Sequence, residues 1–295
     1  MTKTLSICIP TYNRGSKLKQ QIESIISITN PYSSACEIII SDNHSTDNTV
    51  QILNVFQKEY PGKFIVFQQK ENIGFVKNYK FLINQAINDF IWILGDDDPV
   101  YPSVLDTFFK IDISSKELHA FHYNHKCITD KATIIHERFY SFHEDIYSPT
   151  GRDVFYQLAT DHQLGGLMFI SATILQTTSA KHAIATWPQN SNQALPLYVS
   201  AYAASKGGFY FSSDNKLDCI YGSSFWKNET THVFIHDVSE IITAFRKLNY
   251  SRRFCVVQFR MNIKKYIGWK GFIKLCYLKP VYAFRIILFF VKIIL

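Results

Sequence analysis

The chain has 295 residues and a formal net charge of +7, and 47% of its residues are hydrophobic. This length allows one large domain, or one domain with an appendage, and the hydrophobic content excludes a disordered chain. The six cysteines show no CxxC spacing and no zinc-type His/Cys cluster, which argues against a disulfide framework or a structural zinc site and favours a reducing, cytoplasmic setting.

Residues 1–100 alternate between short apolar runs and stretches with helical spacing. The runs predict strands over 5–10, 37–41, 63–68 and 90–94, and the stretches predict helices over 16–28, 46–60 and 76–87. This β-α-β-α-β-α-β order indicates an α/β fold, with a mostly parallel sheet and helices on both faces. The first run is too short for the hydrophobic segment of a signal peptide. In such a sheet, ligands bind beyond the carboxyl ends of the strands.

The pattern is less regular from residue 98 to 224. It predicts helices over 100–111, 152–160 and 194–205, and strands over 119–127, 133–139 and 167–175. No linker or repeat interrupts the chain, so residues 1–225 are predicted to form one domain. Residues 233–295 are predicted to form successive basic, amphipathic helices.

The positive charge is concentrated at the C-terminal end. Residues 241–295 hold 12 lysines and arginines and no acidic residue, together with many aromatic side chains. The apolar stretch 281–295 is shorter than the roughly 20 residues that a spanning helix needs. We therefore expect residues 226–295 to lie on an anionic membrane surface, which would place the protein peripherally on the inner face of the cell membrane. The alternatives are packing on the catalytic domain or on a second subunit, and binding of nucleic acid, for which the chain has no recognisable motif.

Polar residues follow the first two runs. The first run ends in Pro10-Thr11-Tyr12-Asn13-Arg14, and Asp42 directly follows the second. A carboxylate in the position of Asp42 can accept hydrogen bonds from a nucleotide's base or ribose. Ser45, Thr46 and Asp47 can instead cap the next helix.

Three adjacent carboxylates follow the fourth run, in the segment Gly95-Asp96-Asp97-Asp98-Pro99. Their mutual repulsion beside a buried strand would be relieved by a divalent cation. Mg²⁺ and Mn²⁺ prefer oxygen ligands and often keep phosphate oxygens in their coordination shell. The alternative is an acidic loop that caps the next helix.

Four segments together resemble the inverting glycosyltransferase family 2, which has the GT-A fold. Residues 6–14 resemble its opening strand and base-binding loop, residues 37–47 its V-D-D-G-S-x-D segment, residues 72–74 its N-x-G turn, and residues 95–98 its metal-binding DxD region. The form W-I-L-G-D-D-D at residues 92–98 is most similar to the abequosyltransferase-like branch, which is associated with bacterial O-antigen synthesis.

The resemblance implies transfer of a sugar from a nucleotide-diphosphate sugar, with a UDP-sugar expected first, to a saccharide or lipid-linked acceptor in surface polysaccharide synthesis. It implies that Asp98 and Asp96 hold Mn²⁺ or Mg²⁺. It also implies a set of donor-binding residues: Pro10, Thr11, Tyr12, Arg14, Asp42, Asn72, Gly74, Lys77, Asp96 and Asp97. Many relatives carry an acidic residue where Gly95 stands, which leaves open which two aspartates form the working pair.

Sugar transfer also needs a general base for the acceptor hydroxyl. Relatives usually supply an acidic pair before a helix in the second half, whereas residues 189–195 of this chain carry amides. Asp161 is our candidate, with His162 and Asp214 as alternatives, although each is also explained as a cap, surface or core residue. The missing pair keeps open a catalytically inactive nucleotide-sugar-binding or scaffold protein. An oxidoreductase is disfavoured because the first turn lacks G-x-G-x-x-G.

Overall fold

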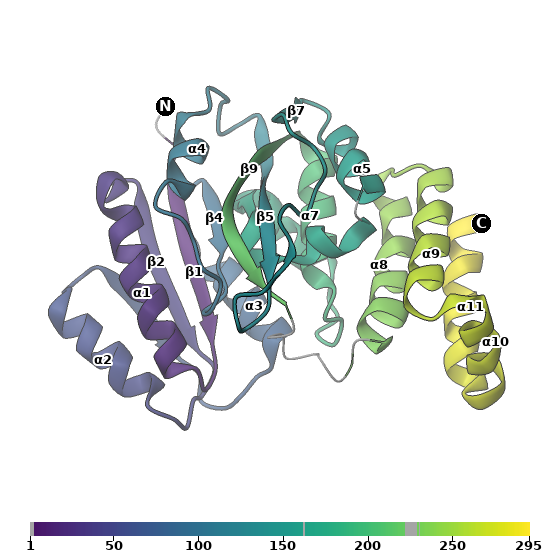
Figure 1. Ribbon diagram of the computed structural model, residues 1–295, viewed down its shortest axis with the longest axis horizontal. Helices are drawn as coiled ribbons and strands as arrows, with labels where there is room; N and C mark the ends of the chain where they lie inside the picture. The colour runs from purple at the N-terminus through teal and green to yellow at the C-terminus, as the bar shows by residue number, and fades with distance from the viewer. Residues whose placement is uncertain (1–2, 162, 222–228, 230) are drawn as a thin grey trace.

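The computed structural model describes residues 3–161, 163–221, 229 and 231–295. A sheet of nine strands crosses the molecule in the order β3-β2-β1-β4-β8-β5-β9-β7, with β6 paired to β5 (Figure 1). The strands are β1 Leu5–Thr11, β2 Cys36–Asp42, β3 Phe64–Gln68, β4 Phe90–Ile93, β5 Leu118–Ile128, β6 Ile134–His136, β7 Ile146–Ser148, β8 Thr173–Gln176 and β9 Gly208–Ile220. The α-helices are α1 Gly15–Thr29, α2 Thr49–Glu59, α3 Phe75–Gln85, α4 Val104–Lys110, α5 Gly151–Asp161, α6 Thr177–Thr186, α7 Leu195–Lys206, α8 Val238–Phe245, α9 Arg252–Tyr266, α10 Gly268–Leu278 and α11 Pro280–Ile294.

The first half of the sheet has the predicted parallel βα arrangement. β1 lies between β2 and β4, β3 lies outside β2, and all three pairings are parallel. Side chains alternate between the two faces along each strand. Leu5, Ile7 and Ile9 therefore join one hydrophobic core, and Cys8 joins the other.

The second half of the sheet mixes directions. β8 pairs antiparallel with both β4 and β5, whereas β9 runs parallel to β5. The strand predicted over 167–175 is largely replaced by the 3-10 turns Gln163–Met168 and Ile170–Ala172, and only its end forms β8. The pattern also missed β9, because polar residues interrupt its sequence and its pairing with β5 shifts register three times.

The sheet separates two hydrophobic cores. Helices α1, α2 and α4 cover one face, and α3, α5, α6 and α7 cover the other. The second core continues into the C-terminal helices, where Ile241, Ile242 and Phe245 of α8 are buried with residues of α5 and α7. The helices on both faces confirm the predicted α/β architecture.

Helices α8 to α11 gather at one end of the molecule, away from α1 and α2 (Figure 1). α11 is amphipathic, and the buried face that it turns to its neighbours contains Ile286, Phe289 and Ile293. None of the described helices combines the length and apolar character needed to cross a membrane. The division of the chain into residues 1–225 and 226–295 stays a prediction.

Candidate functional site

The carboxyl ends of β1, β2 and β4 meet at one edge of the sheet. Thr11, the last residue of β1, pairs in register with Asp42, the last residue of β2. The Thr11 hydroxyl donates a hydrogen bond of 2.7 Å to the Asp96 carboxylate, which follows β4. Three segments that are far apart in the sequence are therefore joined at this edge, where open α/β sheets bind their ligands.

Two cations at the start of α1 neutralise part of the acidic loop. Arg14 lies 3.2 Å from an Asp96 oxygen and 2.6 Å from an Asp97 oxygen, and Lys17 lies 2.8 Å from Asp97. Burial nevertheless raises the pKa of Asp96 to about 6, against the lowering effect of Arg14 and of the Thr11 hydrogen bond. Lys17 was not among the residues predicted from the sequence.

Asp98 is buried against a serine from a distant segment. Its Oδ2 accepts a hydrogen bond of 2.6 Å from the Ser171 hydroxyl, and that hydroxyl oxygen accepts the Gly95 N–H at 2.8 Å. Gln21 of α1 donates to the carbonyl oxygens of Gly95 and Asp98 and so fixes the loop from behind. Burial raises the pKa of Asp98 to about 7, and the neighbouring Asp97 charge adds to the shift.

Gly95 has a steric reason to lack a side chain. An ideal Cβ at this position would lie 2.3 Å from Oδ2 of Asp98. An acidic residue here would therefore displace Asp98 from Ser171.

A hard divalent cation fits the donor set of this loop. Mg²⁺ and Mn²⁺ commonly use only one or two carboxylates and complete their shells with phosphate and water. Asp96 and Asp98 are buried carboxylates with raised pKa values, so a cation would offset an unfavourable burial of charge. Each is also held by protein donors, Asp96 by Thr11 and Arg14 and Asp98 by Ser171.

The loop after β2 is built around Asp42. This residue is 1% exposed, and both of its carboxylate oxygens lie 3.2 Å from the backbone nitrogen of Ser45. Asp47 accepts hydrogen bonds from the backbone N–H groups of Thr49 and Gly15, the first residues of α2 and α1. Asp47 thus pairs with the first N–H group of each helix, although the N-cap residues are Asn48 and Arg14.

A pair of asparagines connects this loop to the start of α3. Asn43 donates from its side chain to Asn72 at 2.9 Å and accepts the Ile73 N–H at 2.9 Å. Asn72 in turn accepts the Gly74 N–H at 2.9 Å, and Gly74 has a φ of 78°. The glycine is used here for its access to positive φ.

The remaining predicted donor contacts border the same edge. Pro10 and Tyr12 are partly buried on either side of Thr11. Lys77 is exposed on the first turn of α3, directly after the segment that carries Asn72 and Gly74. The predicted donor residues therefore lie on or beside the loops that follow β1, β2, β3 and β4.

The candidates for the general base lie in different surroundings. The Asp161 carboxylate accepts hydrogen bonds from the Ser141 N–H at 2.7 Å and from its hydroxyl at 2.5 Å. Asp214 is exposed and pairs with Lys216 at 3.4 Å. His162 falls outside the described residues. Residues 189–195, which carry amides in place of the acidic pair expected from the resemblance, end at the first residue of α7. There the Asn192 side chain donates to Glu240 at 2.8 Å.

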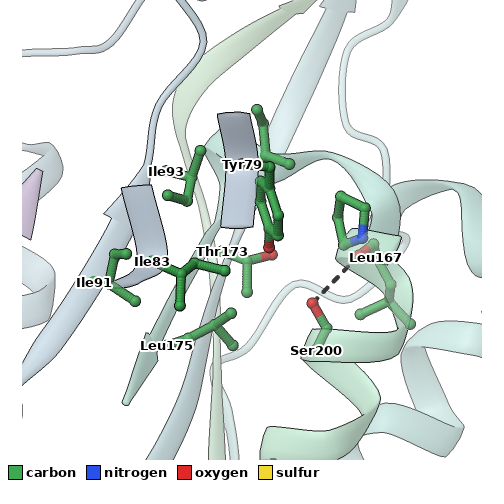
Figure 2. Close-up of a pocket in the computed structure, with 10 residues that line it drawn as sticks. Tyr79, Ile83, Ile91, Ile93, Leu167, Thr173, Leu175 and Ser200 are labelled. Carbon is green, nitrogen blue, oxygen red and sulfur yellow. Dashed lines mark hydrogen bonds between the residues drawn. The ribbon is translucent and has the colours of Figure 1, made fainter. Parts of the chain in front are cut away.

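The interior cavity shown in Figure 2 is not a sugar site. It measures about 10 Å³ and lies between α3, β4, β8 and α7, with Ile83, Ile93 and Leu175 in its lining. Its one drawn hydrogen bond joins the Ser200 hydroxyl to the Leu167 carbonyl oxygen at 3.5 Å. A space of this size holds at most one water molecule. A shallow hollow of about 620 Å³ lies instead beside the loop after β3, lined in part by Gln69 and Ile73.

The segment that carries these loops is similar to known glycosyltransferases. Residues 6–111 match the family model described as glycosyl transferase family 2. The chain is 36% identical over 94 residues to the abequosyltransferase RfbV of Salmonella typhimurium, covering 32% of this chain and 28% of that protein. It is 33% identical over 110 residues to the poly(ribitol-phosphate) beta-N-acetylglucosaminyltransferase TarP of Staphylococcus aureus, covering 36% and 32% of the two chains. The similar segment thus spans about a third of each of these relatives.

Solved structures match the fold over nearly the whole chain. The structure of S. aureus TarS residues 1–349 in complex with UDP-GlcNAc has a TM-score of 0.67 at 15% identity and covers 94% of this chain and 76% of its own. The mannosyltransferase PcManGT from Pyrobaculum calidifontis, in complex with GDP-Man and Mn²⁺, has a TM-score of 0.55 at 10% identity and covers 100% and 86%. These likenesses confirm the predicted GT-A fold.

Proposed function

We propose that the chain is a member of glycosyl transferase family 2, whose model matches residues 6–111, and that it transfers a sugar from a nucleotide-diphosphate sugar to a saccharide acceptor. A UDP-sugar is the proposed donor, and a lipid-linked saccharide of a bacterial surface polysaccharide is the proposed acceptor. A TarS structure holds UDP-GlcNAc, which motivates the choice of donor. A Campylobacter jejuni relative, 31% identical over 106 residues, bears the name GalNAc(5)-diNAcBac-PP-undecaprenol beta-1,3-glucosyltransferase, which motivates the choice of acceptor.

One observation carries this proposal: the ends of β1, β2 and β4, with the residues that follow them, meet at one edge of the sheet. Thr11 at the end of β1 and Arg14 just after it contact Asp96 after β4, and Asp42 at the end of β2 lies in register with Thr11. The fold alone would not assign an activity. A buried carboxylate cluster beside two cations does offer groups for both a nucleoside and its diphosphate.

In this proposal Asp42 accepts hydrogen bonds from the base, and Asp96 faces the ribose. Arg14 and Lys17, which pair with Asp97, are placed to bind phosphate oxygens of the donor. Asp98 and Asp96 would hold the metal. A bound divalent cation supplies Lewis-acid stabilisation to the departing diphosphate.

The acceptor hydroxyl attacks the anomeric carbon from the side opposite the leaving group, and a general base takes its proton. Asp161 stays our candidate for this base. Each of its oxygens accepts one hydrogen bond from Ser141 and keeps a second lone pair that could take the proton. The amides at residues 189–195 favour the second candidate function, a nucleotide-sugar-binding protein without turnover.

The first test is calorimetry with UDP, CDP, GDP and dTDP, each with and without Mn²⁺. We expect one nucleotide to bind clearly better with metal in the wild type, and Asp98→Asn to lose that dependence. Asp214→Asn is the matched control, because Asp214 is an exposed aspartate that pairs with Lys216.

Three outcomes separate the two candidate functions. Metal-dependent binding with product formation supports the transferase, and the same binding without turnover of any donor supports the non-catalytic alternative. The metal-site assignment is contradicted if nucleotide affinity is the same with and without Mn²⁺ and in Asp98→Asn, or if none of the nucleotides binds.

We further propose that α10 and α11 rest on an anionic membrane, as an enzyme with a lipid-linked acceptor would require. The outward faces of these helices expose large apolar side chains, including Tyr277 at 87%, Val281 at 71% and Phe284 at 58%. Exposed lysines and arginines lie among them: Lys274, Lys279, Arg285 and Lys292. Apolar side chains beside cations suit the boundary between lipid headgroups and acyl chains.

Sedimentation with vesicles tests this surface. The double substitution Val281→Glu and Phe284→Glu should abolish co-sedimentation with phosphatidylglycerol vesicles, while Ile65→Glu, a change at an exposed apolar residue of β3, should not. Equal co-sedimentation of both variants, or no preference of the wild type for phosphatidylglycerol over phosphatidylcholine, would reject the proposal.

A further inference from the structure

Two histidines and an aspartate come together where the chain enters the C-terminal helices. His232, His236 and Asp237 belong to a short π-helix, His232–Asp237, that continues into α8. Within the described residues, they form the one group of three or more histidine, cysteine or acidic side chains whose ligand atoms all lie within 4.8 Å of one another. A π-helix closes each turn between residues five apart, so His232 and Asp237 are stacked on one side.

The three donor atoms have the spacing of a metal-binding set. Oδ1 of Asp237 lies 3.4 Å from Nε2 of His232 and 3.1 Å from Nδ1 of His236. Ligands of a tetrahedral zinc ion, with bonds of about 2.0–2.2 Å, are separated by about 3.3 Å. The two imidazole rings stack with centroids 4.9 Å apart and planes 10° apart.

Outer contacts hold the aspartate in place. Asp237 is 2% exposed, and its second oxygen accepts the Gln193 N–H at 2.9 Å, just before α7. The Asn192 side chain donates to the Asp237 carbonyl oxygen at 3.2 Å. The hydrogen bond from Gln193 orients the carboxylate, as outer contacts regularly do in metal sites, and the one from Asn192 holds the backbone of the same residue.

Tyr282 is the aromatic neighbour of the two histidines, and its hydroxyl is buried. The ring of Tyr282, on α11, is 6.0 Å from the ring of His232 and 5.7 Å from that of His236. Its hydroxyl is buried without a hydrogen-bond partner among the described residues, which is costly unless something pairs with it. The His232 side chain is 48% exposed, so solvent and ions can reach the cluster.

We propose that His232, His236 and Asp237 bind a divalent ion of the zinc class, with a fourth position open to water. Imidazole nitrogens favour such borderline ions, whereas the all-carboxylate loop at residues 96–98 favours Mg²⁺ or Mn²⁺. The site would tie the start of α8 to α7 and α11. It differs from the structural zinc site that the cysteine spacing argued against, because it uses no thiolate.

The test is a calorimetric titration of the chelator-treated full chain with Zn²⁺ in the presence of excess Mg²⁺, which occupies sites of hard oxygen ligands. We expect one strongly bound Zn²⁺ per chain. The double variant His232→Asn and His236→Gln keeps amide donors toward Asp237 but should weaken binding at least about 100-fold, since loss of outer-shell groups alone costs 10–100-fold. His182→Ala, an exposed histidine on α6, is the matched control and should bind as the wild type does.

Substitution with Co²⁺ identifies the ligands. The proposed nitrogen and oxygen set should give visible bands without a thiolate charge-transfer band in the near ultraviolet. A thiolate band that disappears in Cys127→Ser with Cys219→Ser would place the ion at that cross-strand thiol pair and overturn the proposal. Equal Zn²⁺ binding by wild type and histidine variant, or no binding by either, would assign the cluster a purely hydrogen-bonding role. Nucleotide binding at Asp98 is read out separately, so its failure leaves this test intact.

Discussion

At the scale of single residues, the acidic loop depends on contacts that its own sequence does not contain. Thr11, Arg14, Asp96 and Asp97 were predicted to act together, and the structure does bring them into contact. Ser171 could not be found from sequence, because a lone serine 73 residues from Asp98 has no local signal. The same holds for Gln21, which lies 74 residues from Gly95 and donates to its carbonyl oxygen.

Gly95 gives the sharpest residue-scale prediction. In Gly95→Ala the new Cβ would start 2.3 Å from the Asp98 carboxylate and push it away from Ser171. We expect metal-dependent nucleotide binding, measured by calorimetry, to weaken at least about tenfold, a loss of about 1.4 kcal/mol. Gly165→Ala is the control, because a Cβ there meets no atom within 4 Å. Equal affinities of the two variants would contradict the steric argument.

The raised pKa of Asp98 predicts how stability changes with pH in metal-free protein. Burial raises this pKa from 3.8 to about 7, so the folded state binds more protons than the unfolded state between these values. The free energy of unfolding should therefore fall as the pH rises from about 4 to about 7. Urea unfolding in chelator at several pH values measures this slope.

The variant Asp98→Asn should reduce that slope, because an amide does not titrate, and the part that remains comes from Asp96, whose pKa burial raises to about 6. Asp214→Asn, which removes an exposed carboxylate, should leave the slope unchanged. A slope that is identical in wild type and Asp98→Asn would show that Asp98 does not carry the pH dependence.

At the scale of elements, the periodicity of the first 94 residues predicted each of the first four strands and three helices within a few residues of its observed bounds. Continuous apolar strands leave little choice of partner, because both of their faces must be covered. The segment 163–176 was not predictable in this way. It forms two 3-10 turns before β8, and the second of them places Ser171 against the acidic loop.

The asparagine connection between the loop after β2 and the start of α3 can be tested by Asn43→Ala. This change leaves the Ile73 N–H and the Asn72 side chain without their partner. We expect the free energy of unfolding to fall by about 1–3 kcal/mol in urea titrations, together with weaker nucleotide binding. Asn54→Ala, on the exposed face of α2, should change neither quantity.

At the scale of the whole molecule, the C-terminal helices serve the core as well as the surface. Ile241, Ile242 and Phe245 of α8 fill the same core as α5 and α7, while α10 and α11 expose apolar side chains on their outer faces. The C-terminal region therefore packs in part on the domain that precedes it, which was one alternative to membrane binding. It also exposes apolar side chains, as the proposed membrane contact requires.

A truncated chain tests whether residues 1–225 form a domain of their own. We expect a chain that ends at residue 231 to lose cooperative unfolding and near-ultraviolet circular dichroism, because the α7 and α5 surfaces that pack on α8 would be exposed. A chain that ends at residue 267 keeps α8 and α9 and should remain folded. Cooperative unfolding of the shorter chain would instead support the predicted boundary.

The amino-acid sequence by itself determined the βα repeat of the first hundred residues and the placement of polar groups at strand ends, because apolar periodicity and chain order dictate both. It also determined the uneven charge, which is a property of composition alone. Only the tertiary structure decided which carboxylates are buried, which partners hold them, and that His232, His236 and Asp237 meet Tyr282 of α11. The physical reason is that burial and hydrogen bonding join residues far apart in the chain, and local sequence patterns carry no record of those contacts.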